Sequence, residues 1–360
     1  MKIRDRYITK TLLNYTIVVL VVWTSIYSFF NFLAELNSVG KESYTILSAF
    51  TYIILQLPEV LYKQASPIIL LGCILGMGHL ASTGQLLIFR VSGASILKIT
   101  LLTLKNSLIF VFFFICIGEF LAPISSNYAE SIRSSAMGNS IKSINQNGFW
   151  IRDGNNFINV KRNVDVTLFS GITVIEVNSS NKIERVIKSE NAIFDGNSLD
   201  MSGNEIFSID DSNSFDNISL KERNSYNKTV SFDQDLIDSL EKEPIDLSTL
   251  TLIKQIRFLT DNKLRSGVFE VELYKRLTQP VTLIAMILLA MLFIFGSTRD
   301  VTLGRKIFFG VALGLSFEML SRVTSAMALS LNFNPFLSSI LPSITVMFIS
   351  IFFLVKKSFS

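Results

Sequence analysis

Few residues in this sequence have the types and spacing that catalysis needs. A phosphate-binding loop requires a glycine-rich run that ends in Gly-Lys-Ser/Thr, and the nearest match, Gly40-Lys41-Glu42, lacks the hydroxyl and the upstream glycine. The single histidine, His79, has no cysteine or carboxylate at metal-ligand spacing, so we interpret it as a helix-end or interfacial residue. We therefore expect this chain to hold no catalytic site, metal or cofactor.

Two charged residues, Glu318 and Arg322, lie four positions apart inside an apolar stretch. Ionisable side chains are expensive inside a bilayer, where they usually face each other or a cavity. Their spacing suits an ion pair along one helix, and the alternative is a charged wall of a substrate cavity. The sequence leaves both interpretations open.

Three basic residues, Lys41, Lys63 and Arg133, lie near the expected outer ends of apolar segments. Basic groups at such positions can bind the phosphates of an anionic amphiphile. Taken singly, each is more often a snorkelling or solvated side chain. The three are therefore candidates for a lipid-headgroup site.

The short segment Ser82–Ser95 combines apolar residues with Arg90 and ends near Gly93. Folded as a helix across the membrane face, it would offer an apolar stripe to a cytoplasmic partner. The alternative is a helix that rests in the lipid headgroups.

Two small-residue motifs, Gly72-x-x-x-Gly76 and Gly310-x-x-x-Gly314, allow close contact between helices in lipid. Such contacts form either within one chain or between subunits.

The elements that carry these residues must lie largely in lipid. Of 360 residues, 49% are hydrophobic and 17% are charged, against about 25% charged residues in soluble domains. About 20 apolar residues span a bilayer as a helix. The first apolar stretch is too long and too aromatic for a cleaved signal peptide.

The Tyr44–Tyr62 stretch, broken at Pro58, is expected to be a bent or interfacial lead-in to the second span. The six predicted spans are Thr11–Leu33, Ser66–Leu80, Ile96–Leu121, Tyr274–Phe295, Lys306–Leu329 and Phe336–Val355.

The charge distribution divides the chain into three parts. Residues 121–270 carry 16 basic and 21 acidic side chains, a net of −5, whereas the rest of the chain carries a net of +9. Because the polar part is acidic, nucleic-acid binding is excluded. Basic residues mark the N-terminus, the second-to-third loop, the fourth-to-fifth loop (with Arg299) and the tail. With six spans these segments share one side, so both termini are predicted to be cytoplasmic and the middle part to lie outside.

The middle part is predicted to be rich in strands. Gly148–Ile151 and Asn156–Val160 flank a turn and form an expected hairpin. Further runs at Ile172–Val177, Arg185–Lys188, Ala192–Asp195 and Ile206–Ile209 suggest a β-sandwich, a jelly roll or an open, stacked β-fold. Leu247–Asn262 has helical periodicity. We expect domain boundaries at residues 1–122, 123–265 and 266–360.

The order of these features resembles the LptF/LptG (YjgP/YjgQ) family of lipopolysaccharide export permeases, and the match covers nearly the whole chain. It is most similar to the LptG branch. The residues that carry the likeness are Asp5–Ile8, Gly118–Pro123, Trp150–Phe157, Gln279-Pro280, Phe293–Gly296 and Arg299.

The resemblance implies an α-helical membrane protein with six transmembrane helices and a periplasmic β-jelly-roll domain inserted between helices 3 and 4. Such a subunit pairs with an LptF-like paralogue and is driven by an LptB-like cytoplasmic ATPase dimer. It passes lipopolysaccharide to an LptC-like protein and a periplasmic jelly-roll bridge. The family's coupling helix, which contacts the ATPase, matches residues 82–95, with Gln85, Leu86, Leu87, Phe89, Arg90 and Gly93 as expected contacts.

The sequence departs from the family pattern at several positions. Gln85 replaces a common glutamate of the coupling helix, so an ionic contact there becomes a hydrogen bond. Lysines common at the outer end of the first span are replaced by Asn31, Asn37 and Ser38, and Glu59 stands where a lysine occurs. These changes leave the phosphate contacts open. Two alternatives remain: a scaffold that couples an ATPase to periplasmic machinery without moving lipid, and the LptF-type subunit.

Overall fold

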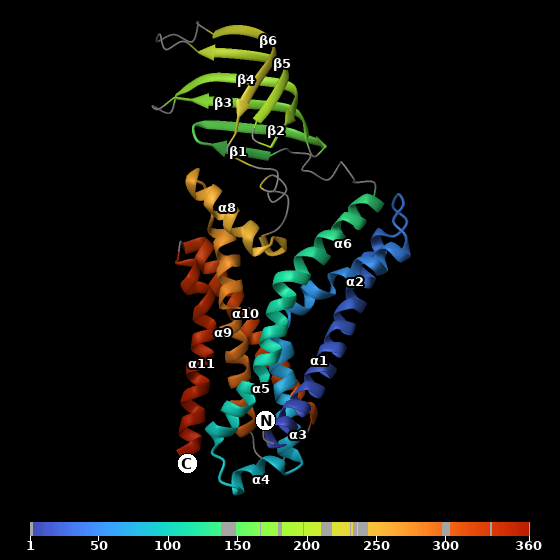
Figure 1. Cartoon of the computed structure of the whole chain (residues 1–360), viewed down its shortest axis with the longest axis vertical. Coiled ribbons are helices and arrows are strands. Elements are labelled where there is room, and N and C mark those ends of the chain that lie inside the picture. Colours follow the sequence, from blue (N-terminus) through green and yellow to red (C-terminus); the bar gives the residue numbers. More distant parts are fainter. Residues whose placement is uncertain are drawn as a thin grey trace. The chain divides into compact units, whose positions relative to one another are not determined.

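The structure is a computed structural model in which the chain forms two compact units (Figure 1). The helical unit comprises Met1–Val39, Ile46–Glu130 and Glu270–Ser360, and the sheet unit comprises Gly40–Thr45 and Ser131–Phe269. The described residues are 3–137, 149–165, 167–178, 182–196, 198–209, 218–230, 232, 236, 244–296, 303–331 and 333–359. The expected Gly148 and Arg299 features lie outside these residues.

Helices dominate the chain outside the strand region. They are α1 (Ile3–Glu35), α2 (Ile46–Lys63), α3 (Ala65–Ser82), α4 (Gln85–Val91), α5 (Ile96–Cys116), α6 (Ala122–Ala136), α9 (Gly267–Gly296), α10 (Leu303–Leu331) and α11 (Pro335–Phe359). A 3₁₀ turn, η1 (Leu36–Ser38), follows α1. Within the described residues, six helical stretches are long and apolar enough to cross a membrane, and each contains or closely matches one predicted span.

The lead-in before the second span is a helix, α2, with Pro58 inside it. The helix that carries the third predicted span continues beyond Leu121, because the π-helical segment η2 (Ile117–Leu121) joins α5 to α6. Pro123 has no backbone N–H, so it cannot complete the usual helical bonding. A π-helical turn directly before it lets the helical course continue.

The centre of the helical unit is α3, which is buried along most of its length. Its Gly72 lies so close to α1 that a Cβ atom would be 2.5 Å from Thr16 Oγ1. On another side of α3, a Cβ on Gly310 of α10 would be 2.6 Å from Leu71 Cδ2. Both small-residue motifs therefore serve contacts within this chain, since backbones approach closely where a side chain is absent.

Two lysines bond to carbonyl groups near helix C-termini. Lys306 Nζ donates to Gly78 O of α3 at 3.0 Å, and Lys357 Nζ donates to Phe295 O of α9 at 3.2 Å. A cation at this end of a helix satisfies orphan carbonyls and complements the helix dipole. These lysines therefore stabilise the bundle itself.

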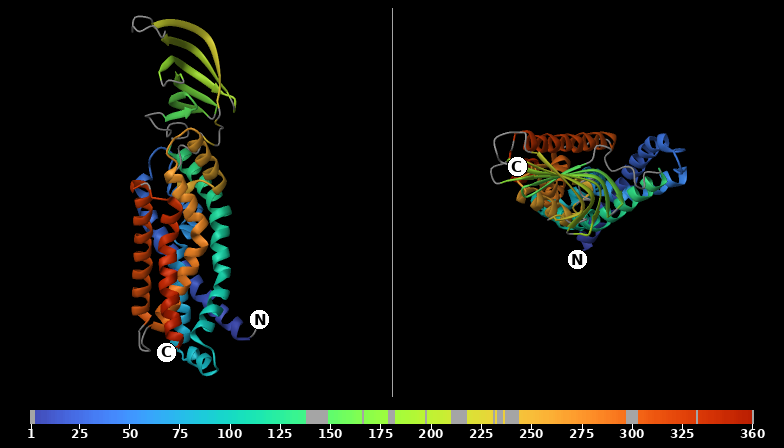
Figure 2. Two further views of the ribbon diagram at one scale, coloured as in Figure 1. Left: turned by 90° about the vertical axis from the view of Figure 1, so that its left-hand side faces the viewer. Right: turned by 90° about the horizontal axis from the view of Figure 1, so that it is seen from above.

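Among the described residues of the sheet unit, six antiparallel strands form one curved sheet (Figure 2). They are β1 (Phe149–Asp153), β2 (Asn156–Asp165), β3 (Leu168–Val177), β4 (Ile183–Phe194), β5 (Ser198–Ile209) and β6 (Ile218–Thr229). Each strand pairs with the next in the sequence. This sequential order does not confirm a jelly roll.

The hairpin prediction is confirmed, because Phe149 pairs with Val160 and the turn lies at Gly154-Asn155. The two short runs predicted between residues 185 and 195 are parts of the single strand β4. The helix predicted at 247–262 is α8 (Thr249–Asp261), and the Ser248 hydroxyl caps it by accepting from Thr251 N. Phe258 and Leu259 of α8 join the apolar core of the sheet.

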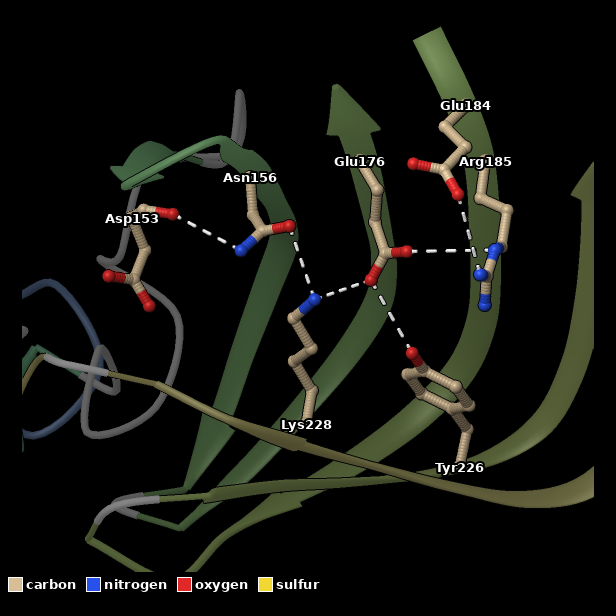
Figure 3. A network of polar contacts seen from close by, with 7 residues as sticks. All are labelled: Asp153, Asn156, Glu176, Glu184, Arg185, Tyr226 and Lys228. Atoms are coloured by element: carbon tan, nitrogen blue, oxygen red, sulfur yellow. Dashed lines mark hydrogen bonds and ion pairs between the residues drawn. The ribbon is translucent and has the colours of Figure 1, made fainter. Parts of the chain in front are cut away.

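A polar network links strands that are not neighbours in the sheet (Figure 3). Lys228 of β6 forms an ion pair with Glu176 of β3 and donates to Asn156 Oδ1 of β2 at 3.1 Å. Tyr226 OH donates to Glu176 Oε1 at 3.4 Å, and Arg185 Nε lies 3.8 Å from Glu176 Oε2. The network therefore holds β6 against β2 and β3 in addition to the sheet's own hydrogen bonds.

Candidate functional site

An open pocket of about 370 Å³ lies beside α1 in the helical unit. Its lining residues are Trp23, Ile26, Tyr27, Phe30, Asn31 and Gln64. Five of the six come from successive turns of α1, and two of the six are carboxamides. The pocket therefore combines a broad apolar and aromatic surface with two groups that both donate and accept hydrogen bonds.

Helix packing explains why the pocket opens at this level. Lower in the bundle α1 lies close against α3, with Thr16 opposite Gly72 and Leu12 opposite Gly76. That antiparallel register brings Trp23 level with Gln64, the residue between α2 and α3. Gln64 has non-helical dihedrals (φ −100°, ψ 12°), so the chain changes direction between α2 and α3. This change lies just beyond the close contact of Gly72 and Gly76 with α1.

Few residues of the first span are fully buried in the isolated chain, and many are exposed. Only 6% of its most apolar window is buried, against 78% for the second span. A helix of this kind faces lipid, a partner or a substrate cavity. The pocket therefore lies on a surface that this chain does not itself cover.

The structure divides the three predicted headgroup residues between the two units. Lys63 belongs to the helical unit, where it forms an ion pair with Glu59 one turn earlier in α2. Lys41 and Arg133 belong to the sheet unit. The loop of Lys41 is tied to the end of α6, because Ser43 N and Oγ both donate to Ala136 O, at 3.0 and 2.8 Å.

The segment predicted as a coupling helix forms α4, between Gly84 (φ +74°) and Gly93 (φ +84°). Leu86 is buried, and Phe89 packs partly on the core of the helical unit. Leu87, Ile88 and Val91 are exposed, Val91 to 81%. The predicted contacts therefore lie on two faces, and the sequence interpretation missed the exposed Ile88.

Gln85 and Arg90 of α4 differ in their surroundings. The Gln85 Oε1 atom is buried and has no hydrogen-bond partner among the described residues. A buried acceptor without a partner carries a cost in free energy. Arg90 is exposed on the same short helix.

Glu318 and Arg322 pair with each other along α10, with 3.3 Å between Arg322 Nε and Glu318 Oε1. The pair predicted from the four-residue spacing is thus present. Its side chains are nevertheless 40% and 75% exposed, beside exposed apolar residues such as Met319 and Val323. The pair forms, and it also faces outward from this chain.

Sequence reasoning missed a cluster around Tyr62. The Tyr62 ring packs on Gly118 of η2 so closely that a Cβ there would lie 2.1 Å from Tyr62 Cδ2. Burial raises the pKa of the Tyr62 phenol to about 12, against the opposing effect of the Arg276 charge. Arg276 Nε lies 3.7 Å from Glu272 Oε1 within α9. No sequence spacing links these residues of three different helical segments.

The chain matches, over residues 6–356, the model of a family described as lipopolysaccharide export system permease LptF/LptG. The chain belongs to this family. It is 27% identical to the lipopolysaccharide export system permease protein LptG of Escherichia coli (strain K12) over 358 residues, 98% of each chain. It is 28% identical to the protein of the same name from Haemophilus influenzae (strain ATCC 51907 / DSM 11121 / KW20 / Rd) over 342 residues, 94% of each chain.

As an LptF/LptG permease, the chain is a multi-pass inner-membrane subunit for lipopolysaccharide export. Its role is that of a transporter's membrane subunit rather than an enzyme. The features to be explained by this role are the exposed first span, its pocket, and the exposed face of α4.

Proposed function

We propose that this chain is the LptG-type half of a membrane exporter that extracts lipopolysaccharide from the inner membrane. An LptF-like permease forms the other half, and an LptB-like ATPase dimer supplies the energy. The lipid is delivered to an LptC-like protein and a periplasmic bridge of jelly-roll domains. The exposed first span with its pocket carries the proposal, because a substrate cavity shared with a partner leaves such a span uncovered by its own chain.

In this proposal the lipid enters between the first span of this chain and the fifth span of its partner. Phe and Leu side chains hold the acyl chains, and Lys41, Lys63 and Arg133 meet the headgroup at the rim. The exposed Glu318–Arg322 pair fits a cavity or subunit surface better than bulk lipid, where exposed charge is costly. Removing acyl chains from lipid costs about 0.8 kcal/mol per CH₂, so extraction requires the partner's ATP hydrolysis.

Helix α4 is proposed to transmit the ATPase's motion. Its exposed Leu87, Ile88 and Val91 offer an apolar face, with Arg90 beside them. Gln85, at the start of α4, is proposed to contribute a hydrogen bond to the ATPase. In this arrangement Leu86 and Phe89 attach α4 to the bundle, so that a push on α4 reaches the spans.

The proposal includes an orientation in the membrane and a division into domains. Both termini and α4 lie in the cytoplasm, and the sheet unit lies in the periplasm as the family's jelly-roll domain. The proposed division is residues 1–122 and 266–360 for the spans and 123–265 for the periplasmic domain. Basic residues in the short loops support this orientation.

Co-purification followed by lipid release tests the function. The full-length chain should bring down a second permease and an ATPase. The reconstituted complex should transfer lipopolysaccharide to a soluble jelly-roll acceptor only with ATP. A complex that hydrolyses ATP, assembles with periplasmic partners and never moves lipid would instead establish the scaffold alternative. Recovery of an LptG-type partner would show that this chain is the LptF-type subunit.

A further inference from the structure

The pocket beside α1 is unusual for a site that meets an anionic lipid, because none of its six lining side chains is charged at neutral pH. Its polar groups are the carboxamides of Asn31 and Gln64, together with the Tyr27 phenol and the Trp23 indole. The volume of about 370 Å³ falls within the range of roughly 300–1,000 Å³ typical of ligand pockets.

The surroundings of the pocket on its own helices are also poor in free positive charge. The sequence has no lysine or arginine between Lys10 and Lys41, which covers the whole pocket-lining part of α1. The ionisable residue one turn beyond Asn31 is the acidic Glu35. A phosphate near this part of α1 therefore meets an acidic rather than a basic neighbour.

The lysine that precedes Gln64 is already paired. Lys63 and Glu59 form an ion pair in α2, with side chains 32% and 13% exposed. A lipid phosphate at this position would have to compete with the Glu59 carboxylate. The pair has no net charge, so it gives the pocket little attraction for a phosphate.

Neutral carboxamides suit a different part of a glycolipid. Amide and ester carbonyls and hydroxyl groups lie where the acyl chains join the sugars, and a carboxamide both donates to and accepts from such groups. Aromatic side chains such as Trp23 and Tyr27 offer an apolar body with a polar tip for the same boundary. The pocket's chemistry therefore matches the junction between sugar and acyl chains.

We propose that this pocket binds the sugar–acyl junction of the exported lipid, with Asn31 and Gln64 as specificity-determining residues, and that binding there does not depend on lipid phosphates. The inference rests on the proposed function. Lipid phosphates are then bound by other basic groups, because the ion pair with Glu59 keeps Lys63 from binding them.

Photocrosslinking inside the full-length complex tests this inference. A photoreactive amino acid at Phe30, which lines the pocket, is compared with one at Phe29, which is exposed on α1 but does not line it. The probes are lipid A with two phosphates and the same lipid A without phosphates, each in vesicles of neutral phospholipid. We expect Phe30 to capture both lipids with similar yield and above the yield at Phe29.

Three substitutions sharpen the test. Gln64→Leu and Asn31→Leu should each lower capture of both lipids at Phe30 by about fivefold, the effect of one lost hydrogen bond. Glu59→Gln should shift capture toward the phosphorylated lipid, because it releases Lys63. Dividing the crosslinking yield by the amount of assembled complex separates these effects from any loss of folding. The two leucine variants test the two carboxamides independently.

The contrary results are distinct. The inference would be overturned if complexes with the photoreactive residue at position 30, and no other substitution, strongly preferred the phosphorylated lipid. It would also be overturned if the leucine variants captured both lipids with unchanged yield. If the complex extracts lipid but none reaches Phe30, the inference fails and the proposed function stands. If the assembled complex extracts neither lipid with ATP, the proposed function itself fails.

Discussion

At the scale of single residues, the contact between Gly118 and Tyr62 constrains the helical unit most tightly. A Cβ at residue 118 would lie 2.1 Å from Tyr62 Cδ2 and 2.5 Å from Tyr62 Cγ. Both the ring and the π-helical turn that carries Gly118 would have to shift. The position therefore tolerates no larger side chain without local repacking.

We expect Gly118→Ala to destabilise the complex by about 1–3 kcal/mol, the usual cost of overpacking. The measurement is the thermal unfolding midpoint of the purified complex in detergent. Gly304→Ala is the matched control, because a Cβ there meets nothing within 4 Å. Adding Tyr62→Leu to Gly118→Ala should recover part of the loss. An unchanged midpoint for Gly118→Ala would show that this contact is looser than described.

Individual functional residues were only partly predictable from the sequence. The Glu318–Arg322 pair followed from a spacing of four, because helix geometry fixes which side chains meet. The Lys63–Glu59 pair has the same spacing, although the sequence interpretation assigned Lys63 to a lipid headgroup. The contact between Gly118 and Tyr62 could not be predicted, since it depends on the packing of segments far apart in the sequence.

At the scale of elements, the seam between α1 and α3 sets where the pocket begins. Along this seam a Cβ at Gly72 would lie 2.5 Å from Thr16 Oγ1 and 2.9 Å from Thr16 Cα. A Cβ at Gly76 would lie 3.3 Å from Leu12 Cδ2, the end of a flexible side chain. The two glycines of one motif therefore have unequal roles.

Substituting each glycine by alanine should reveal this inequality. We expect Gly72→Ala to cost about 1–3 kcal/mol, because backbone atoms must separate, and Gly76→Ala to cost clearly less. Gly72→Ala should also reduce lipid capture at Phe30, since α1 moves away from Gln64. Thermal unfolding and the capture yield are measured on the same samples. Equal effects of the two substitutions would contradict the closer approach of α1 to Gly72 than to Gly76.

Helix α4 presents a second element whose two faces differ. Ile88→Asp places a charge on the exposed face, so folding should be unchanged while affinity for the ATPase falls about tenfold, as for an interface hot spot. Leu86→Asp makes the same chemical change on the buried face and should destabilise the helical unit instead. Co-purified ATPase and the unfolding midpoint are the two readouts. If Ile88→Asp retains full ATPase binding and stimulation, α4 does not couple through this face.

The reliability of element prediction followed the strength of each periodic or apolar pattern. The six spans were predicted because long apolar runs have few alternatives to a helix. Strand β6 was missed because Ile218–Thr229 is mostly polar and lacks alternation. The single strand β4 was read as two because polar Ser189–Asn191 interrupts its apolar residues. The continuation from α5 to α6 was missed because Pro123 normally ends a helix.

At the scale of the whole molecule, the charge split acquires a more specific meaning. The net of +9 outside residues 121–270 includes Lys306 and Lys357, which bond to the ends of α3 and α9. These lysines therefore stabilise helix ends, in addition to the part that the proposed orientation gives them. The first span and its neutral pocket are surfaces that the proposed partner permease would cover.

Cysteine labelling tests the proposed orientation directly. The chain has two cysteines, and Cys73 is buried, so the Cys116→Ala variant should show little labelling of its own. Ser92 and Asp195 are both exposed, and one span, α5–α6, separates them in the sequence. In spheroplasts, a membrane-impermeant maleimide should label Asp195→Cys at once, and Ser92→Cys only after the membrane is permeabilised. The reverse pattern would invert the orientation and place α4 away from any cytoplasmic ATPase. Labelling of both sites in intact spheroplasts would mean that the third span does not cross the membrane.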